Sequence, residues 1–233
     1  MDPSVLTVYK SPFTKVRIGR NHDGGYIIVQ IPEIIYTTLI AGGINDDISF
    51  EEDFIKKYPD TKKVLALDGS IDKLPKEIPK ISFLKKNIGY ENNERTTNLH
   101  DIIDGTKEGI FIKMDIEGGE IPWINSLSDE QLNKFEQIVM EFHNPFSEKE
   151  NEVFQKINKH HYLIHFHGNN HCGVRDHQGV RIPNVFECTY LHKKYFTKTV
   201  ELNQDNIPGV LDMKNWTVAG EIQIDYPPFV HHG

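Results

Sequence analysis

Three carboxylates and two glycines directly follow an apolar run in the segment Ile110–Glu120, which reads IFIKMDIEGGE. The carboxylates are Asp115, Glu117 and Glu120, and they surround Gly118–Gly119. A strand that delivers carboxylates to its end and then turns on glycines is how open α/β sheets present reactive groups above the sheet. Carboxylates in that position can accept a proton from a substrate or bind a cation. A solvated acidic loop is the purely structural alternative.

Strand and helix patterns alternate around this motif. Together they predict a Rossmann-like, doubly wound and mostly parallel α/β sheet with helices on both faces, preceded by a β-hairpin. The hairpin is expected within 16–32, with its turn at Asp23–Gly25. Strand patterns cover 36–43, 62–70, 81–89, 110–115, 137–143, 162–168 and part of 180–195, and helix patterns cover 48–58, 96–104, 128–135 and 148–160. We expect one domain over 1–233, with a hairpin extension (1–35), an α/β core (36–200) and a C-terminal extension (201–233).

Composition limits the classes of partner and compartment. The 233 residues are 38% hydrophobic and 26% charged, as in ordinary globular proteins, and the net charge is −8. An acidic chain argues against nucleic acid as the partner. No apolar run approaches the roughly 18 residues of a membrane span, and the N-terminus lacks the basic and apolar regions of a secretory signal. With two cysteines, Cys172 and Cys188, we expect a cytoplasmic protein, and the oligomeric state stays open.

Several strand patterns end in glycine or polar residues that would meet at one edge of a parallel sheet. Gly42–Gly43 ends the first strand, where the backbone can approach a ligand. Asp68 ends the second strand and can accept hydrogen bonds from a ribose diol. Asp46–Asp47 would lie badly beside a pyrophosphate but would suit a cation. This combination favours a nucleoside cofactor such as S-adenosylmethionine, which carries a sulfonium and an ammonium, over a dinucleotide.

The segments VLALDGS, TTNLHDII and GIFIKMDIEGGEIPWI together resemble the FkbM-type S-adenosylmethionine-dependent methyltransferases. That family typically shows a strand reading K-[IM]-D-[VI]-E-G-x-E, which Lys113–Glu120 matches. The likeness covers about residues 36–145. The chain departs from the family pattern at its first glycine loop, where the family commonly has D-x-G-x-x-x-G and this chain reads AGGINDD from Ala41 to Asp47.

The resemblance implies a class I methyltransferase fold and methyl transfer to a hydroxyl, most often of a sugar or polyketide. By this resemblance, Gly42 and Gly43 would contact the methionine portion of the cofactor, Asp68 the ribose, and Asn87 and Ile88 the adenine. Asp115 would also contact the cofactor. Asp115 and Glu117 would lie where the acceptor hydroxyl meets the methyl group. The expected partner is therefore a glycan or another small polyhydroxylated acceptor.

Histidines near the later strand ends offer a base or a metal site. His143 and His167 are candidate catalytic residues together with Asp115 and Glu117, since O-methylation needs a group that removes the hydroxyl proton. A second possibility is Mg²⁺, Mn²⁺ or Zn²⁺ bound by Asp115, Glu141, His143 and His165. Structural roles for these histidines, and a zinc site that includes Cys172 and Cys188, are further alternatives.

Two other classes of function remain open at this stage. One is a catalytically silent sugar- or protein-binding domain that keeps the methyltransferase fold, which the atypical glycine loop permits. The other is a metal-dependent oxygenase or hydrolase built on the histidine-rich half of the chain. Cofactor binding separates the methyltransferase from the metal-dependent oxygenase or hydrolase. Turnover separates it from the silent binding domain.

Overall fold

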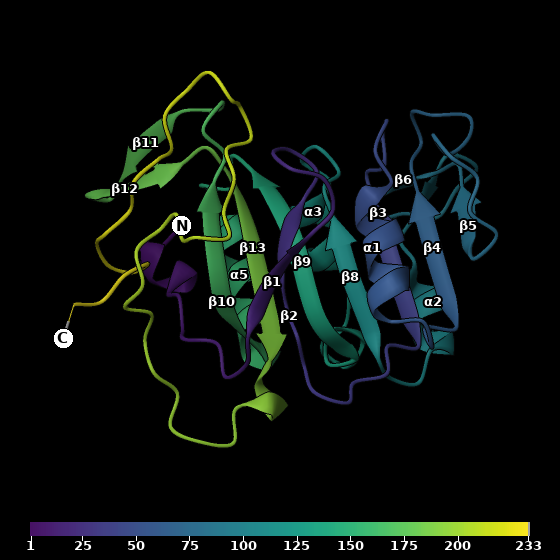
Figure 1. The fold of residues 1–233 in the computed structure, drawn as a ribbon, viewed down its shortest axis with the longest axis horizontal. Helices are drawn as coiled ribbons and strands as arrows, with labels where there is room; N and C mark the ends of the chain where they lie inside the picture. The colour runs from purple at the N-terminus through teal and green to yellow at the C-terminus, as the bar shows by residue number, and fades with distance from the viewer. Residues whose placement is uncertain (233) are drawn as a thin grey trace.

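A central seven-stranded sheet organises the computed structural model, which describes residues 1–232 (Figure 1). Its strands in spatial order are β10 (His161–Gly168), β13 (Val185–His192), β9 (Phe135–His143), β8 (Ile110–Met114), β3 (Thr38–Gly42), β4 (Lys63–Leu67) and β5 (Ile81–Leu84). β13 is antiparallel to both of its neighbours, and every other adjacent pair is parallel. The predicted mixed α/β fold with a mostly parallel sheet is confirmed.

The two faces of the sheet are covered differently, so the predicted doubly wound arrangement is only partly correct. Helices α2 (His100–Gly105), α3 (Glu120–Ser126) and α5 (Glu148–His160) lie behind the sheet in Figure 1. Helix α4 (Asp129–Leu132) contacts α2 and α5. The front face carries α1 (Ser49–Lys57) and the hairpin of β1 (Lys15–Ile18) and β2 (Tyr26–Val29). All four residues of β2 are buried, and β2 contacts β9 and β13. The hairpin therefore takes the place that a second helix would have on this face.

Smaller elements complete the structure and differ from the sequence-based prediction in detail. They are the 3-10 helices η1 (Pro3–Leu6) and η2 (Lys193–Tyr195), and the short strands β6 (Asn87–Ile88), β7 (Thr96–Thr97), β11 (Val174–His177) and β12 (Val180–Pro183). The helix predicted over 96–104 begins only at His100, because Thr96–Thr97 pairs with β6. Helix α3 begins at Glu120, the last residue of the acidic motif, and was not predicted.

β8 shows why an unbroken apolar run becomes the centre of such a sheet. All five of its residues are buried, because it lies between two parallel strands with both faces covered. Ile112 and Met114 pack into the core beneath the helices, whereas Phe111 packs into the core beneath α1 and the hairpin. The alternation of side chains along a strand therefore sends Lys113 to the hairpin side, where it is also buried.

The connections leaving β3 create the crevice in which ligands of such sheets bind. From β3 the chain passes to β4 on one side, while β8 lies on the other side. The strand order therefore reverses at β3, and the carboxyl end of this strand is the position where open α/β sheets bind ligands. Within residues 1–232, no helix combines the length and apolar character needed to cross a bilayer.

Candidate active site

A cavity of about 460 Å³ opens at the carboxyl ends of β3, β4 and β8. Its walls include most of the residues predicted to contact a cofactor: Gly43, Asp68, Asn87, Ile88 and Asp115. Gly42 does not line the cavity. The volume lies within the range of small-molecule sites, which is about 300–1,000 Å³. We refer to this cavity as the crevice.

Gly42 and Gly43 are required by close packing of two strand ends. A Cβ on Gly42 would lie 2.5 Å from Ile88 Cδ1 and 2.7 Å from the sulfur of Met114. Gly43 has φ +76°, and a Cβ there would lie 1.6 Å from the carbonyl oxygen of Asp115. The glycines therefore let the loop after β3 lie against the chain leaving β8, which forms one wall of the crevice.

Lys113 holds this glycine loop in place. Its ammonium donates a hydrogen bond to the carbonyl of Gly43 at 2.8 Å and lies 5.4 Å from the ring centre of Tyr26. The residue is largely buried but lines the crevice, so its positive charge lies at the crevice wall, close to Asp115. A buried lysine needs such partners because desolvation disfavours an unpaired charge. Its position within an otherwise apolar strand was the sequence signal for this role.

Asp68 organises the opposite side of the same loop. Its Oδ2 accepts hydrogen bonds from the backbone N–H groups of Ile44 and Asn45, at 3.0 and 2.8 Å. Its Oδ1 accepts two more from the backbone and hydroxyl of Ser70. Burial alone would raise the pKa of Asp68, but these four hydrogen bonds hold it below its ordinary value. A bound diol would have to replace the Ser70 hydroxyl, which is the partner with rotational freedom.

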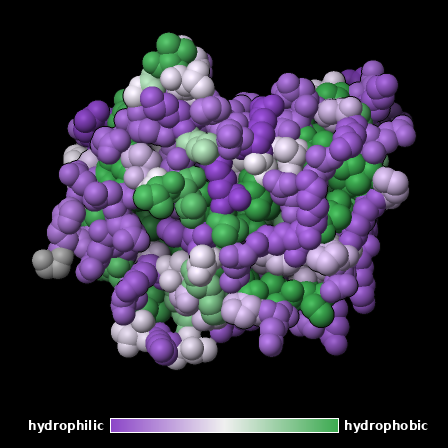
Figure 2. All heavy atoms as spheres, in the orientation of Figure 1, coloured by the Kyte–Doolittle hydropathy of each residue, from purple (hydrophilic) through white to green (hydrophobic). Residues whose placement is uncertain are grey.

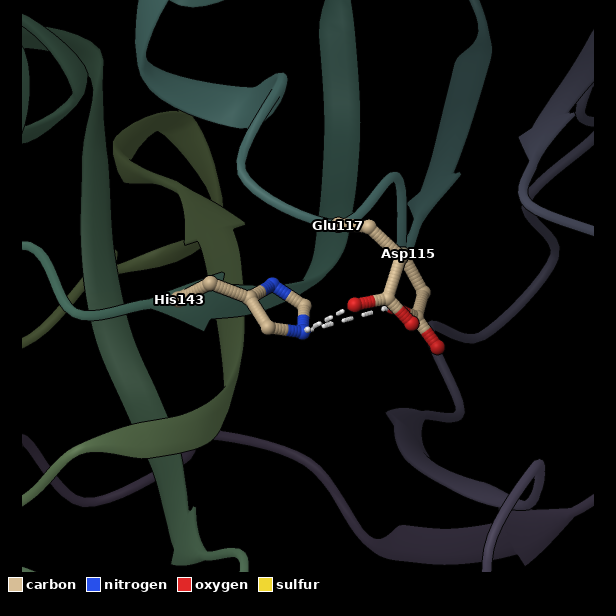
Figure 3. A group of neighbouring side chains, drawn as sticks. All are labelled: Asp115, Glu117 and His143. Carbon is tan, nitrogen blue, oxygen red and sulfur yellow. Dashed lines mark ion pairs between the residues drawn. The ribbon is translucent and has the colours of Figure 1, made fainter. Parts of the chain in front are cut away.

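Beside the crevice, four carboxylates surround the imidazole of His143, which ends β9. Nε2 lies 3.3 Å from Glu141, 3.4 Å from Glu117 and 4.0 Å from Asp115, and Nδ1 lies 3.3 Å from Glu120. Figure 3 shows the ring pointing at the carboxyl groups of Asp115 and Glu117, which come from the segment after β8. We refer to these five residues as the acidic cluster.

The acidic cluster keeps His143 protonated. Burial disfavours a charged imidazole, but the carboxylates of Glu120 and Glu141 outweigh it and raise the pKa of His143 to about 11. Burial also raises the pKa of Asp115 and of Glu141. An imidazolium has no free lone pair, so His143 in this state cannot serve as the general base that the sequence suggested. The proton acceptors of the acidic cluster are its carboxylates.

We expect the free energy of unfolding to fall as the pH rises from 7 to 9. His143 and His167 have folded-state pKa values raised to about 11 and about 10, so their stabilising effect is complete below pH 6.5 and is lost as the pH rises through those values. Each contributes at most about 1.4 kcal/mol per pH unit. Urea unfolding at pH 7, 8 and 9 with a chelator present measures the slope. His143→Gln should reduce the slope by up to about 1.4 kcal/mol per pH unit and leave the part due to His167. The exposed His22→Gln should not change it, and a level wild-type profile would contradict this assignment.

Asp115, Glu117 and His143 satisfy the spacing of a metal site. One ligand atom from each lies within 4.8 Å of the other two. Oδ1 of Asp115 is buried without a hydrogen-bond partner, as is Oε2 of the adjacent Glu141. Two carboxylates and an imidazole suit Mn²⁺ or Zn²⁺, and two carboxylates also suit Mg²⁺. The donor set present therefore fits a divalent cation.

His165 does not join this group, which corrects the predicted set of ligands. Its Nε2 lies 2.9 Å from Asp212 Oδ1, in a second cavity beside β10. The prediction treated the strands carrying His143 and His165 as neighbours. β13 lies between them and is antiparallel to both, so the histidines of β10 are displaced by the width of one strand.

The position of His167 does not suit a catalytic residue in the crevice. Its side chain is 2% exposed and lies between Glu187 on β13, at 3.5 Å, and Glu221, at 3.4 Å. Burial lowers its pKa, but these two carboxylates outweigh burial and hold the imidazole charged. His167 therefore links the C-terminal segment to the sheet.

The two cysteines do not share a site. Cys188 is fully buried and packs into the core beneath the helices, whereas Cys172 is exposed. Cys188 alternates with Glu187 along β13, so the two side chains lie on opposite faces of the sheet. A zinc site that includes both cysteines is therefore excluded in this structure.

Tyr26 and Glu120 belong to the site, although neither is among the residues predicted to be catalytic, cofactor-binding or metal-binding. The Tyr26 hydroxyl donates to Asp115 Oδ2 at 3.1 Å, from strand β2 of the hairpin. Glu120 is fully buried and accepts a hydrogen bond from the backbone of Ile116 at 2.9 Å, which closes the turn before α3. Glu120 had a usable signal, because it ends the Asp-x-Glu-Gly-Gly-Glu motif. Tyr26 had none, since only the packing of the hairpin brings it there.

Comparison with known proteins identifies the family. The model of the methyltransferase FkbM domain matches residues 15–175, which is more than half of the chain. This chain belongs to the FkbM methyltransferase family. The suspected resemblance is thus confirmed, and the match extends through the hairpin, which the sequence comparison had left out. Membership in the family suggests methyltransferase activity.

One solved structure similar to this FkbM-family chain is the crystal structure of methyltransferase FkbM from Methylobacillus flagellatus KT. The two share 12% identity with a TM-score of 0.42, over 67% of this chain and 43% of the other. This chain thus spans less than half the length of that protein. No curated protein matches the sequence.

Proposed function

We propose that this protein is an S-adenosylmethionine-dependent O-methyltransferase that acts on a hydroxyl of a sugar or similar polyhydroxylated acceptor. The observation that carries the proposal is the position of Asp115. This residue lines the crevice, accepts a hydrogen bond from Tyr26 and keeps one buried oxygen without a hydrogen-bond partner. A free carboxylate oxygen between a cofactor-sized cavity and the acidic cluster suits removal of a hydroxyl proton.

The charge of the crevice supports a cationic cofactor. Its basic residues are Arg20, Lys86 and Lys113, and its acidic residues are Asp23, Asp46, Asp47, Glu51, Asp68, Asp115 and Glu117. Arg20 is already paired with Asp47 at 3.2 Å. An excess of carboxylates attracts the sulfonium and ammonium of S-adenosylmethionine and repels the pyrophosphate of a dinucleotide.

The residues of the site would then divide the work of methyl transfer. S-adenosylmethionine supplies an electrophilic methyl group. Asp115 accepts the proton of the acceptor hydroxyl, and burial assists by raising its pKa toward the working pH. His143, held protonated by Glu120 and Glu141, keeps the Asp115 and Glu117 carboxylates from repelling one another. Tyr26 orients Asp115 through its hydroxyl.

Calorimetric titration with S-adenosylmethionine and S-adenosylhomocysteine tests the cofactor. We expect micromolar binding of both, and at least tenfold weaker binding by Asp68→Ala, because this variant loses the ribose acceptor and the anchor of the loop after β3. Asp72→Ala is the control, since Asp72 is exposed and pairs with Lys85 outside the crevice lining. Unchanged affinity of Asp68→Ala would remove Asp68 from the cofactor site.

A divalent cation is a second proposed component, held by Asp115, Glu117 and His143. Because a metal-bound imidazole must be neutral, Mn²⁺ has to displace the proton from His143. We therefore expect Mn²⁺ affinity, measured by electron paramagnetic resonance, to rise by up to about tenfold per pH unit between 6 and 8. His143→Gln should abolish binding and His165→Gln should leave it intact. Loss of binding in both variants would restore the ligand set predicted from the sequence, and intact binding in His143→Gln would exclude His143 as a ligand.

The silent binding domain is the competing proposal, and the same experiments separate it. A protein that binds neither S-adenosylmethionine nor S-adenosylhomocysteine, with or without a chelator, would support it. Binding of the cofactor without turnover on any hydroxylated acceptor would also favour it.

A further inference from the structure

A second cavity, of about 600 Å³, lies beside β10 on the hairpin side of the sheet. It shares no lining residue with the crevice. Figure 2 shows hydrophobic side chains reaching the surface over β10, β13 and the hairpin, within a largely hydrophilic face. The apolar part of the wall includes Val8, Ile27, Ile164, Phe166, Ile207 and Leu211. A mostly apolar cavity of this size is typical of small-molecule sites.

Four ionisable side chains line this cavity: Lys15, His165, Asp212 and the exposed Asp205. Nε2 of His165 lies 2.9 Å from Oδ1 of Asp212, and the two side chains are 9% and 1% exposed. Asp212 also accepts a hydrogen bond from the backbone of Gly209 at 2.7 Å. Lys15 of β1 reaches the carbonyl of Ile164 only at 3.4 Å, so two of its three N–H donors remain for another acceptor.

The chemistry of this group defines what it can recognise. Serine, threonine and cysteine are absent from the wall of the cavity as described, so the wall holds no hydroxyl or thiol nucleophile. Asp205 also lines the cavity, but it is exposed and its charge is screened by water. Among the carboxylates that are shielded from solvent, Asp212 balances the charge of Lys15, so neither an anion nor a cation is favoured. A hydroxyl group can accept a hydrogen bond from Lys15 and donate one to the imidazole of His165 or to Asp212. We propose that this cavity binds a small uncharged molecule with an apolar body and one hydroxyl group.

This site is separate from the proposed methyltransferase site and goes beyond that function. Between the acidic cluster and the cavity lie His167 and Glu187, whose side chains are only 2% and 6% exposed. Asn215 covers them by donating to Glu187 at 2.8 Å. A molecule in the cavity is therefore screened from Asp115, and its binding does not depend on the cofactor.

Calorimetric titration of the full chain with 1-octanol, octanoate and octylamine tests the proposal, since the three probes share a chain and differ in the polar group. We expect saturable binding of one octanol per protein and at least fivefold weaker binding of the two charged probes. Saturating S-adenosylhomocysteine should leave the octanol affinity unchanged, so failure of the proposed methyltransferase function would not affect this result. Absence of saturable octanol binding, or tighter binding of a charged probe, would overturn the proposal.

A matched pair of variants locates the binding. A Cβ on Gly209 would meet Asp212 Oδ2 at an ordinary 3.7 Å, so Gly209→Leu adds a side chain at the polar end of the cavity without strain. Gly220→Leu adds the same side chain to the same segment, at a position with no neighbour within 4 Å and outside the cavity lining. We expect Gly209→Leu to weaken octanol binding at least tenfold and Gly220→Leu to leave it unchanged. Equal affinities in two variants with native circular dichroism would contradict the assigned location.

Discussion

Asp115→Asn is expected to lower the rate of methyl transfer by about 10²–10⁴, the range typical of loss of a general base. The asparagine side chain has nearly the same volume and can still accept the hydrogen bond from Tyr26, so the crevice should keep its shape. The free energy of unfolding should not fall, because the substitution removes a buried carboxylate whose pKa is already raised by burial.

Single-turnover kinetics with bound S-adenosylmethionine measure this effect apart from binding. Asp46→Asn provides the matched control, since it removes one negative charge from the same crevice at a side chain that is 76% exposed. We expect the control to change the rate less than threefold. Near-normal turnover by Asp115→Asn would exclude Asp115 as the proton acceptor and direct attention to Glu117.

Gly43→Ala is expected to have the largest effect on stability among single methyl additions in the crevice. The added Cβ would lie 1.6 Å from the carbonyl oxygen of Asp115, and the residue has φ +76°. The left-handed conformation costs about 1–2 kcal/mol for alanine, and overpacking adds about 1–3 kcal/mol. We therefore expect a loss of about 2–5 kcal/mol in urea unfolding, together with loss of cofactor binding as the loop moves away from β8.

Gly118→Ala separates the two contributions. Gly118 has φ +94°, but a Cβ there would meet nothing within 4 Å. This variant should lose only the conformational cost of about 1–2 kcal/mol and should keep cofactor binding. Equal losses in both variants would mean that the contact between Gly43 and Asp115 does not hold the loop in place.

Much of the fold could be predicted from local patterns. The apolar run of β8, the hairpin turn and the amphipathic helix α5 each follow from residue types within a short window, and they form where the patterns indicate. The Ser128–Gln131 capping box likewise starts α4, with reciprocal hydrogen bonds of 2.9 and 3.1 Å. In contrast, α3 follows a double glycine and carries Pro122 in its first turn, so its pattern resembled that of a loop.

The candidate site was predictable only where its residues are close in sequence or follow parallel strands. Asp115 and Glu117 were selected from one motif, and Asp68 and Asn87 from strand ends that meet at one edge of the sheet. Glu141 and His143 converge, as expected for alternate residues of one strand. Whether these residues bind a cofactor stays a prediction.

The mixed α/β class, the hairpin and the acidic motif could be predicted from local sequence, because each depends on neighbours along the chain. Which side chains surround that motif depends on how distant segments pack together. The insertion of β13 between β9 and β10 assigned His165 and His167 to other partners, and the packing of β2 brought Tyr26 to Asp115. The physical reason is that strand order and hairpin docking depend on burial of apolar surface between segments far apart in sequence, and no local pattern encodes which distant segment will provide it.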